Sequence, residues 1–243
     1  MATSATAGQR WTAIVGGATA RTGPAVLRTF LQAGYQVVAT TRREAELRRY
    51  LAGLPGGDAV EVVSADLLDP AAAERVVGAA LARFGQVDAV TVLAQGGFVQ
   101  RPFAETSLDE LRRLIEGNLY LTYNLCRAVL PPMLERGHGH IVTVAGGSAL
   151  DPGYGRALFG ASKAAVVTLT KGIARDYKAR GIVANCLVAG TIATEDAARY
   201  LDEAAVRAAA TMDEFAQALC FLCSPQSSGI NGAAVELNAR EVD

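Results

Sequence analysis

The chain has 243 residues, 51% of them hydrophobic, and a formal net charge of −1. This length and composition suit one α/β domain with a sizeable core. The near-zero charge argues against binding to nucleic acid or to an anionic membrane surface, and no apolar run approaches the ~18 residues of a transmembrane helix. We therefore expect a cytoplasmic protein with a flexible N-terminal tail over residues 1–10 and one domain over residues 11–243.

The first predicted unit is a strand, a turn of small residues and a helix. Thr12–Val15 is an apolar run with β-branched residues, which is typical of a buried strand. Gly16–Thr19 breaks this run, and helical periodicity starts near Thr22. Such a turn lets the backbone approach a pyrophosphate at a helix N-terminus, which predicts dinucleotide binding. The candidate contact residues are Gly17, Thr19, Arg21, Thr22 and Gly23.

This unit departs from the dinucleotide fingerprint at one position. The third glycine of the fingerprint falls on Ala20 or on Arg21, depending on the spacing chosen. Alanine is a small change, whereas Arg21 brings a long side chain whose charge could also meet a phosphate. The alternative is a strand–helix turn that binds nothing.

The end of the second strand bears on which dinucleotide would bind. Tyr35–Thr40 predicts this strand, and Arg43–Leu54 predicts the helix after it. An acidic residue here would bind the ribose hydroxyls of NAD, whereas an arginine accommodates the 2′-phosphate of NADP. Because Arg42 and Arg43 stand here and no acid does, we expect NADP(H) in preference to NAD(H). The alternative is that both arginines form the solvated first turn of the helix.

The third strand ends in another candidate contact. Val60–Ser64 predicts the strand, and Asp66 and Leu67 follow it. At the carboxyl edge of a sheet, Asp66 can accept a hydrogen bond from an adenine amino group. Its alternative role is a helix N-cap, but Asp69 fills that role better for the predicted helix Pro70–Phe84.

The middle of the chain predicts a central strand and a long helical region. Val87–Leu93 is very apolar, and small residues beginning with Ala94 follow it, at the sheet edge where ligands bind. Apolar residues at helical spacing then run from Ser107 to Arg136. Asn118 interrupts this apolar face and suggests a buried hydrogen-bonding role. Pro131 and Pro132 are expected to kink or end the region.

The fifth strand, His140–Val144, leads into a loop that carries Gly146, Ser148 and Tyr154. The helix predicted after this loop, Ala157–Ala179, contains Phe159, Ser162 and Lys163. Lys163 has small neighbours on a largely apolar helix, so it is expected to be partly buried. The alternative is an exposed lysine.

The last part of the chain completes the alternation of strands and helices. Ile182–Val188 predicts the sixth strand, a helical patch is expected over Phe215–Leu222, and Ala233–Leu237 predicts the last strand. Between Thr194 and Met212 we expect a small helical lid that carries Glu195, Asp196, Arg199 and Tyr200. This alternation predicts an α/β protein with a Rossmann-type, doubly wound parallel sheet in three α/β/α layers.

The cysteines and histidines give no separate site. Cys220 and Cys223 have the spacing of a redox pair, but they lie in an apolar helical run and are expected to be buried structural thiols. His138 and His140 have no cysteine or carboxylate beside them in the sequence, so no metal site is expected.

Taken in order, these segments resemble the short-chain dehydrogenase/reductase family from Trp11 to Leu237. The resemblance rests on Gly17 and Gly23, Asp66-Leu67, Asn118, IVTV at 141–144, ASKAAV at 161–166 and AGTIAT at 189–194. It implies hydride transfer between NAD(P) and a small-molecule alcohol or carbonyl, and a homodimer or homotetramer that pairs through the helices near residues 107–130 and 157–179. It also implies cofactor contacts at Ala94, Lys163, Gly190 and Ile192.

By position, the resemblance implies that Lys163 and Asn118 match the family's catalytic lysine and asparagine. The family's tyrosine lies four residues before the lysine, where this chain has Phe159. Its serine lies thirteen residues before the tyrosine, where this chain has Gly146. A phenyl ring cannot donate a proton, and glycine has no side chain with which to orient a substrate.

Three hypotheses follow. A divergent oxidoreductase would act on a carbonyl, enone or alcohol, with Tyr154 and Ser148 of the nearby loop in place of the missing pair. A non-redox enzyme, such as a cyclase, isomerase or dehydratase, would use the same cavity. A catalytically silent member would bind a nucleotide or act as a partner subunit. In the second and third cases no cofactor need be used in catalysis.

Overall fold

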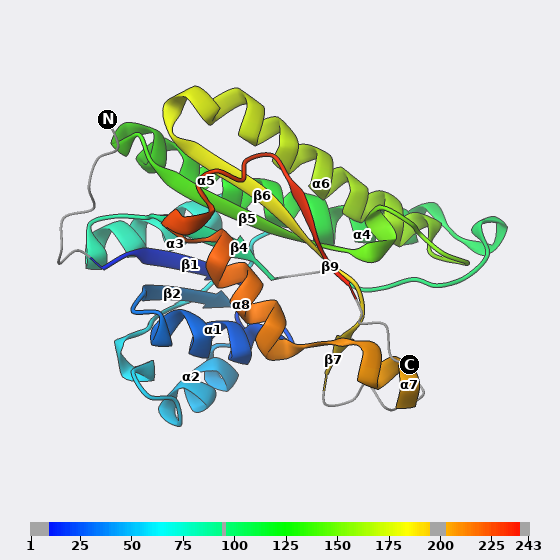
Figure 1. The fold of residues 1–243 in the computed structure, drawn as a ribbon, viewed down its shortest axis with the longest axis horizontal. Helices are drawn as coiled ribbons and strands as arrows, with labels where there is room; N and C mark the ends of the chain where they lie inside the picture. Colours follow the sequence, from blue (N-terminus) through cyan, green and yellow to red (C-terminus); the bar gives the residue numbers. More distant parts are fainter. Residues whose placement is uncertain (1–9, 94–95, 195–202, 239–243) are drawn as a thin grey trace.

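The computed structural model describes residues 10–93, 96–194 and 203–238, and Figure 1 shows their arrangement. Within these residues, seven strands form one parallel sheet in the order β3-β2-β1-β4-β5-β6-β9. The strands are β1 (Thr12–Gly16), β2 (Gln36–Thr41), β3 (Glu61–Ser64), β4 (Ala89–Val92), β5 (Gly139–Gly146), β6 (Ile182–Ala189) and β9 (Ala234–Leu237). The predicted Rossmann-type parallel sheet is confirmed, with small shifts at the strand ends.

Helices cover both faces of this sheet, because alternate strand residues point to opposite sides. The helices are α1 (Gly23–Gln32), α2 (Glu44–Ala52), α3 (Pro70–Phe84), α4 (Leu108–Ile115), α5 (Leu121–Arg136), α6 (Ala157–Tyr177), α7 (Glu203–Ala208) and α8 (Met212–Leu222). Ala13 and Val15 of β1 belong to a core cluster with α1, α2 and α8. Ile14 between them belongs to a second cluster with α3, α5 and α6. The result is the predicted three-layer arrangement.

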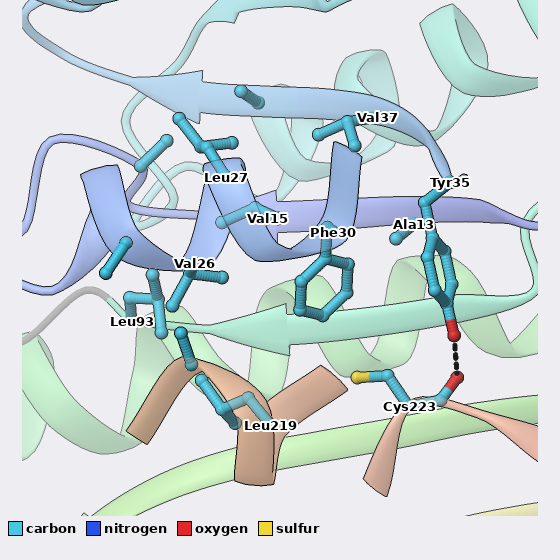
Figure 2. Close-up of a cluster of buried hydrophobic side chains, with 14 of the residues drawn as sticks. Ala13, Val15, Val26, Leu27, Phe30, Tyr35, Val37, Leu93, Leu219 and Cys223 are labelled. Carbon is cyan, nitrogen blue, oxygen red and sulfur yellow. Dashed lines mark hydrogen bonds between the residues drawn. The ribbon is translucent and has the colours of Figure 1, made fainter. Parts of the chain in front are cut away.

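The first of these core clusters holds α1 between the sheet and α8. Figure 2 shows Val26 and Phe30 of α1 between the sheet and Leu219 of α8, and Phe30 and Leu219 are fully buried. The Tyr35 hydroxyl donates a hydrogen bond to the carbonyl oxygen of Cys223 at 3.0 Å. The helix is therefore held over most of its length by apolar packing, which keeps its N-terminus in place.

The sheet topology places a crevice above β1 and β4. The chain adds β2 and β3 on one side of β1, and then returns to add β4 on the other side. The loops that leave β1 and β4 therefore diverge, and ligands bind at such a switch point in α/β sheets. The residues that follow these two strands lie at the carboxyl edge, as expected.

One helical region departs from the prediction in an informative way. The segment predicted as a single helical region is interrupted by a π-helix over Glu116–Tyr120 between α4 and α5. Asn118 lies in this π segment and is buried. A Cβ atom on Gly117 would lie 2.2 Å from the Cα of Gly96, so the two backbones touch. π segments of this kind are frequent at functional sites.

The prolines in α5 do not end it. Pro131 and Pro132 lie inside the helix, which continues to Arg136 and closes at Gly137 with φ +68°. Val129 and Met133 on either side are fully buried in the core. This packing holds the helix together past the missing backbone N–H groups, so tertiary contacts outweigh the local preference.

The region after β6 is only partly described. Ile192–Ala193 (β7) pairs in parallel with Ala210–Thr211 (β8), a short ladder that was not predicted. The helical part of the predicted lid that the structure describes is α7. Glu195, Asp196, Arg199 and Tyr200 lie outside the described residues, as do residues 1–9 of the predicted tail.

Two further sequence expectations are tested by the fold. Cys223 is fully buried, Cys220 is half-buried, and both thiols are free, which agrees with structural roles. None of the described helices combines the length and hydropathy needed to cross a bilayer.

Candidate functional site

The crevice at the carboxyl edge opens into a cavity of about 1800 Å³. This volume exceeds the usual range for a pocket that holds one small molecule, which is roughly 300–1000 Å³. Most of the residues predicted for the site line it: Gly17, Thr19, Arg21, Thr22, Arg42, Asp66, Leu67, Gly146, Ser148, Phe159, Lys163, Gly190 and Ile192. Ala94 lies outside the described residues.

The turn after β1 forms one end of the cavity, and its two glycines have distinct causes. Gly17 has φ +75°, a backbone conformation that favours glycine. A Cβ atom on Gly23 would lie 2.0 Å from the carbonyl oxygen of Ala18, so any side chain would force the turn apart. The N-terminus of α1 therefore packs directly on the turn, and Thr22 and Pro24 beside it line the cavity.

The side chains after β2 hold this turn from the outside. The hydroxyls of Thr19 and Thr41 are 2.5 Å apart. Arg43 donates a hydrogen bond to the carbonyl oxygen of Thr19 at 2.5 Å and pairs with Glu46 at 2.9 Å. The sequence analysis did not identify Thr41, and it considered only the charge of Arg43. The contacts of both residues with Thr19 could not be predicted, because they join segments that are distant in the sequence. Arg43, one of the two arginines after β2, is therefore already bound to groups of the protein itself.

Arg42 is the other arginine, and it faces Asp66. The Arg42 guanidinium lies 3.6 Å from the Asp66 carboxylate, and both side chains are largely exposed. Asp66 also accepts a hydrogen bond from the Leu68 N–H at 3.1 Å. Asp69 caps α3 by accepting from the Ala71 N–H, as predicted. Asp66 is therefore not the cap of α3, and its carboxylate is held by the turn after β3.

Lys163 on α6 is the most deeply buried charged group of the site. Its side chain is 3% exposed, so the alternative of an exposed lysine is wrong. The Nζ atom donates to the carbonyl oxygen of Val144 on β5 at 3.4 Å. Burial lowers the pKa of Lys163 to about 8, against a small opposing effect of Cys186. At neutral pH the amine is charged but gives up its proton more easily than an ordinary lysine.

Asn118 lies beside α6 in the π segment. Its amide nitrogen donates to the Ser162 hydroxyl at 3.1 Å, and that hydroxyl donates to the carbonyl oxygen of Phe159 at 2.8 Å. The amide oxygen of Asn118 is buried and has no hydrogen-bond partner among the described residues. A buried acceptor in this state costs free energy, which is a mark of a site that receives a ligand or water.

Phe159 and Gly146 face each other across the same end of the cavity. Phe159 is buried and meets Phe98 edge-to-face, with the ring centroids 5.0 Å apart. A Cβ atom on Gly146 would lie 3.3 Å from the edge of the Phe159 ring. The two residues therefore form one apolar wall, with Phe98 as a member that sequence reasoning missed.

The two loop residues that could replace the missing pair are placed differently. Ser148 is buried and lines the cavity. Tyr154 is 81% exposed and is not among the described residues that line the cavity. In this conformation its hydroxyl therefore has no access to a substrate held there.

The cavity lining also carries charges of both signs. Arg113, Glu116, Asp151 and Arg156 are among the lining residues. The Arg156 guanidinium carbon lies 5.5 Å from the centroid of the Phe98 ring, within the range of a cation–π contact. The apolar wall therefore has at least one charged neighbour, Arg156.

The histidines lie at the opposite edge of the sheet. His138 Nε2 lies 2.9 Å from a carboxylate oxygen of Asp88, a partner distant in the sequence that was not foreseen. His140 is buried and its Nδ1 lies 3.3 Å from the carbonyl oxygen of Leu222. Among the described residues, no three histidines, cysteines or carboxylates gather as a metal site would require.

Comparison with known proteins places these features in context. The family model described as enoyl-(acyl carrier protein) reductase matches residues 17–239. The 2-(R)-hydroxypropyl-CoM dehydrogenase of Xanthobacter autotrophicus is 30% identical, over 93% of this chain and 96% of its own. The 2,3-dihydroxy-2,3-dihydro-p-cumate dehydrogenase of Pseudomonas putida is 28% identical, over 93% and 92%.

Solved structures of similar proteins share the fold described above. A 3-ketoacyl-(acyl-carrier-protein) reductase from Brucella melitensis, complexed with NADH, is 27% identical and superposes with a TM-score of 0.86, covering 95% of this chain and 97% of that one. A structure described as ElxO with NADP bound has a TM-score of 0.85 at 22% identity, covering 94% and 97%, and so shares the fold.

Proposed function

The chain belongs to the short-chain dehydrogenase/reductase family of oxidoreductases, and we propose that it uses NADP(H) in preference to NAD(H). The substrate is a small carbonyl, enone or alcohol. The catalytic site is non-standard, because Phe159 and Gly146 stand where the family has its tyrosine and serine. The protein acts as a homodimer or homotetramer.

The single observation that carries this proposal is the packing of α1 on the turn after β1. Gly23 touches Ala18 so closely that no side chain fits, and the turn and helix N-terminus line a cavity large enough for a dinucleotide and a substrate. This cradle fits a pyrophosphate. A bound nicotinamide dinucleotide would supply or accept the hydride. The NADH complex of the Brucella reductase supports this choice of cofactor.

The preference for NADP(H) rests on Arg42. The two residues directly after β2 are arginines, and the second, Arg43, is engaged by Thr19 and Glu46. Arg42 pairs only loosely with Asp66 at 3.6 Å, and exposed pairs of this kind stabilise by about 0–1 kcal/mol. Arg42 can therefore exchange Asp66 for a 2′-phosphate at little cost, while Asp66 turns to an adenine amino group.

The non-standard catalytic site rests on the wall formed by Phe159, Gly146 and Phe98. This wall offers no hydroxyl, whereas Lys163 lines the cavity and Asn118 is buried beside α6. By resemblance, these two match the family's lysine and asparagine. Ser148 is the hydroxyl that lines the cavity from the neighbouring loop, so we assign it contact with the substrate oxygen. Tyr154 would serve only if the loop around it moved its hydroxyl into the cavity.

Packing within the chain bears on which residues of α6 could take part in the proposed oligomer. A Cβ atom on Gly160 would lie 2.5 Å from the carbonyl oxygen of Ser148, so this glycine is required by packing within the chain. Ala161, by contrast, is exposed on α6. Helix pairing would then use Ala161 of α6, together with the exposed Tyr120 at the end of the π segment and the exposed Tyr123 of α5.

The test is an assay with NADPH or NADH and a panel of small ketones, aldehydes and enones, together with the reverse assay on alcohols. Consumption of NADPH faster than of NADH is expected, with product confirmed by mass spectrometry. Arg42→Ala should lower the preference for NADPH about tenfold, the scale of one charge-assisted hydrogen bond. Arg49→Ala, an exposed arginine on α2, is the control and should leave it unchanged.

Two other outcomes would decide between the alternatives. Conversion of substrate without a change in nicotinamide absorbance would favour a non-redox enzyme, for which the absence of a hydroxyl on the Phe159–Gly146 wall is the specific argument. Binding of nucleotide with no conversion of any substrate would favour a catalytically silent member.

A further inference from the structure

Lys163 is isolated from carboxylates in a way that ordinary buried lysines are not. Buried charges are normally paired. The Lys163 side chain is 3% exposed, yet no carboxylate among the described residues lies within ion-pair distance of its Nζ atom. Its hydrogen bond is the one to Val144, at the long distance of 3.4 Å. The remaining N–H groups of the ammonium are therefore available to a molecule in the cavity.

This ammonium lies beside the Phe159 ring, at the position where the family has its tyrosine. The Nζ atom lies 5.9 Å from the centroid of the Phe159 ring, and the edge of that ring faces Gly146. All three residues line the cavity. A substrate oxygen that enters between Phe159 and Gly146 meets carbon atoms from both, and the Lys163 ammonium lies beside the Phe159 ring.

The lysine at position 163 is unusual in this chain, in which most basic residues are arginines. Of 23 basic residues, only Lys163, Lys171 and Lys178 are lysines, and the others are arginines. An arginine cannot release its proton near neutral pH, whereas a buried lysine can. A position that only had to hold a positive charge could equally have been an arginine.

We propose that Lys163 is the proton donor of the reaction. This inference rests on the proposed function. In a reduction, a bound reduced nicotinamide would supply the hydride to the substrate carbonyl carbon and would be oxidised in return. The carbonyl oxygen receives a proton from the Lys163 ammonium, directly or through one water. One N–H bond breaks, one O–H bond forms, the electron pair stays on Nζ, and the neutral amine then takes a proton from solvent.

The surroundings of Lys163 allow this cycle. Burial lowers its pKa to about 8, near the operating range of a general acid. The elements packed against α6 are β5, β6, α4, the π segment and the two short helical turns Gly147–Ala149 and Lys178–Arg180. Their titratable or charged groups are His140, Cys186, Asp109, Glu110, Arg112, Arg113, Glu116, Tyr120, Lys178 and Arg180. Of these, Cys186 acts on the pKa of Lys163, and its own pKa is raised by burial, so it stays neutral.

The test compares Lys163→Arg with wild type. The arginine keeps the positive charge and the donors that hold a ribose, but it cannot give up a proton. Binding of NADPH, measured by calorimetry, should stay within about tenfold of wild type, whereas turnover should fall by about 10²-fold or more, the scale of general acid catalysis. Lys171→Arg, on the exposed side of the same helix, is the matched control and should keep full turnover.

A second measurement does not depend on this variant folding. The three lysines give three Nζ signals in ¹⁵N-lysine-labelled protein, and Lys171→Arg and Lys178→Arg leave Lys163 as the remaining one. Its signal should titrate near pH 8, and kcat for reduction should fall with rising pH over the same range. A Lys163 signal that stays charged above pH 10 would overturn the inference.

The outcomes separate this inference from the proposed function. Turnover by Lys163→Arg within about tenfold of wild type would refute proton donation by Lys163 while leaving an NADP(H)-dependent reductase in place. Loss of turnover in Tyr154→Phe together with retention in Lys163→Arg would assign the proton to the loop tyrosine. A wild-type protein that binds no dinucleotide would remove the proposed function and this inference together.

Discussion

Phe159 and Gly146 lie close together, and their spacing bears on the proposal that the catalytic site is non-standard. The edge of the Phe159 ring lies 3.3 Å from where a Cβ atom on Gly146 would be, and the tip of the ring lies 3.7 Å away. A serine at position 146 would therefore press lightly on a ring that can shift, and a tyrosine at 159 would carry its hydroxyl from the ring tip. The backbone needs no rebuilding for either side chain.

This geometry predicts that two substitutions restore a hydroxyl pair. The double variant Phe159→Tyr with Gly146→Ser should reduce simple carbonyls at least about tenfold faster than wild type, because a phenol is then available as general acid. Steady-state turnover with NADPH measures the gain.

The control for this variant is a serine placed one residue along the chain. A Cβ atom on Gly147 would have no neighbour closer than 3.7 Å, so Gly147→Ser is also tolerated. Combined with Phe159→Tyr, it should give no comparable gain. Equal gains from both serines would show that the position of the hydroxyl does not matter, and no gain from either would show that the rest of the cavity has diverged too.

At the scale of elements, Asp88 joins three parts of the fold at the amino edge of the sheet. One carboxylate oxygen accepts from the Thr12 N–H at 2.7 Å and from Gln86 at 2.8 Å. The other accepts from Arg136 and lies next to His138, both at 2.9 Å. The start of β1, the start of β4 and the end of α5 therefore share one buried carboxylate.

Asp88 also makes stability depend on pH. Burial alone would raise its pKa, but the hydrogen bonds from His138 and Thr12 and the charge of Arg136 lower it overall. A carboxyl with a lowered pKa stabilises the fold above its unfolded pKa of about 3.9, and this contribution is lost as the pH falls through the folded value.

Asp88→Asn should therefore lower the free energy of unfolding by about 3 kcal/mol at neutral pH, since Arg136 and His138 lose their charged partner. Urea unfolding at several pH values measures the difference, which should shrink in acid. Asp58→Asn, at an exposed aspartate before β3, is the control and should change little. A loss that stays the same down to pH 3 would contradict the role given to the carboxylate.

The sequence predicted elements well where local composition and packing agree. The apolar, β-branched runs located the seven strands because such runs are typical of a parallel sheet that is covered on both faces. The π segment at Asn118 could not be foreseen, because it depends on Gly117 meeting Gly96 from another loop. The short pair β7–β8 has two residues in each strand, too few for any periodicity.

The same distinction holds for the site. The glycines after β1, Asp66, Lys163 and Asn118 could be located because they follow strands or interrupt a helix pattern. The contact of Arg43 with Thr19 and the contact of Phe98 with Phe159 join distant loops, so no spacing predicts them. Tyr154 illustrates the opposite error, since its place in the correct loop did not bring its side chain to the cavity.

On the scale of the whole molecule, the stabilising network and the candidate site lie at opposite edges of the sheet. The amino edge of the sheet carries the buried network of Asp88, and the carboxyl edge carries the cavity with Arg42, Asp66 and Lys163. Phe159 and Gly146 lie on the cavity side, so these residues do not disturb the buried network at the amino edge. We propose that the turn after β1 binds a nicotinamide dinucleotide and prefers the phosphorylated form.

The most direct test is calorimetric titration of NADPH and NADH into wild type, Gly23→Ala and Gly78→Ala. A Cβ atom on Gly78 in α3 meets nothing within 4 Å, so this variant is the matched control. Wild type and Gly78→Ala should bind NADPH more tightly than NADH. Gly23→Ala, which drives a methyl group into Ala18, should weaken NADPH binding by at least about tenfold, or 1.4 kcal/mol. Absence of binding to either dinucleotide in wild type, or unchanged binding in Gly23→Ala, would contradict the account.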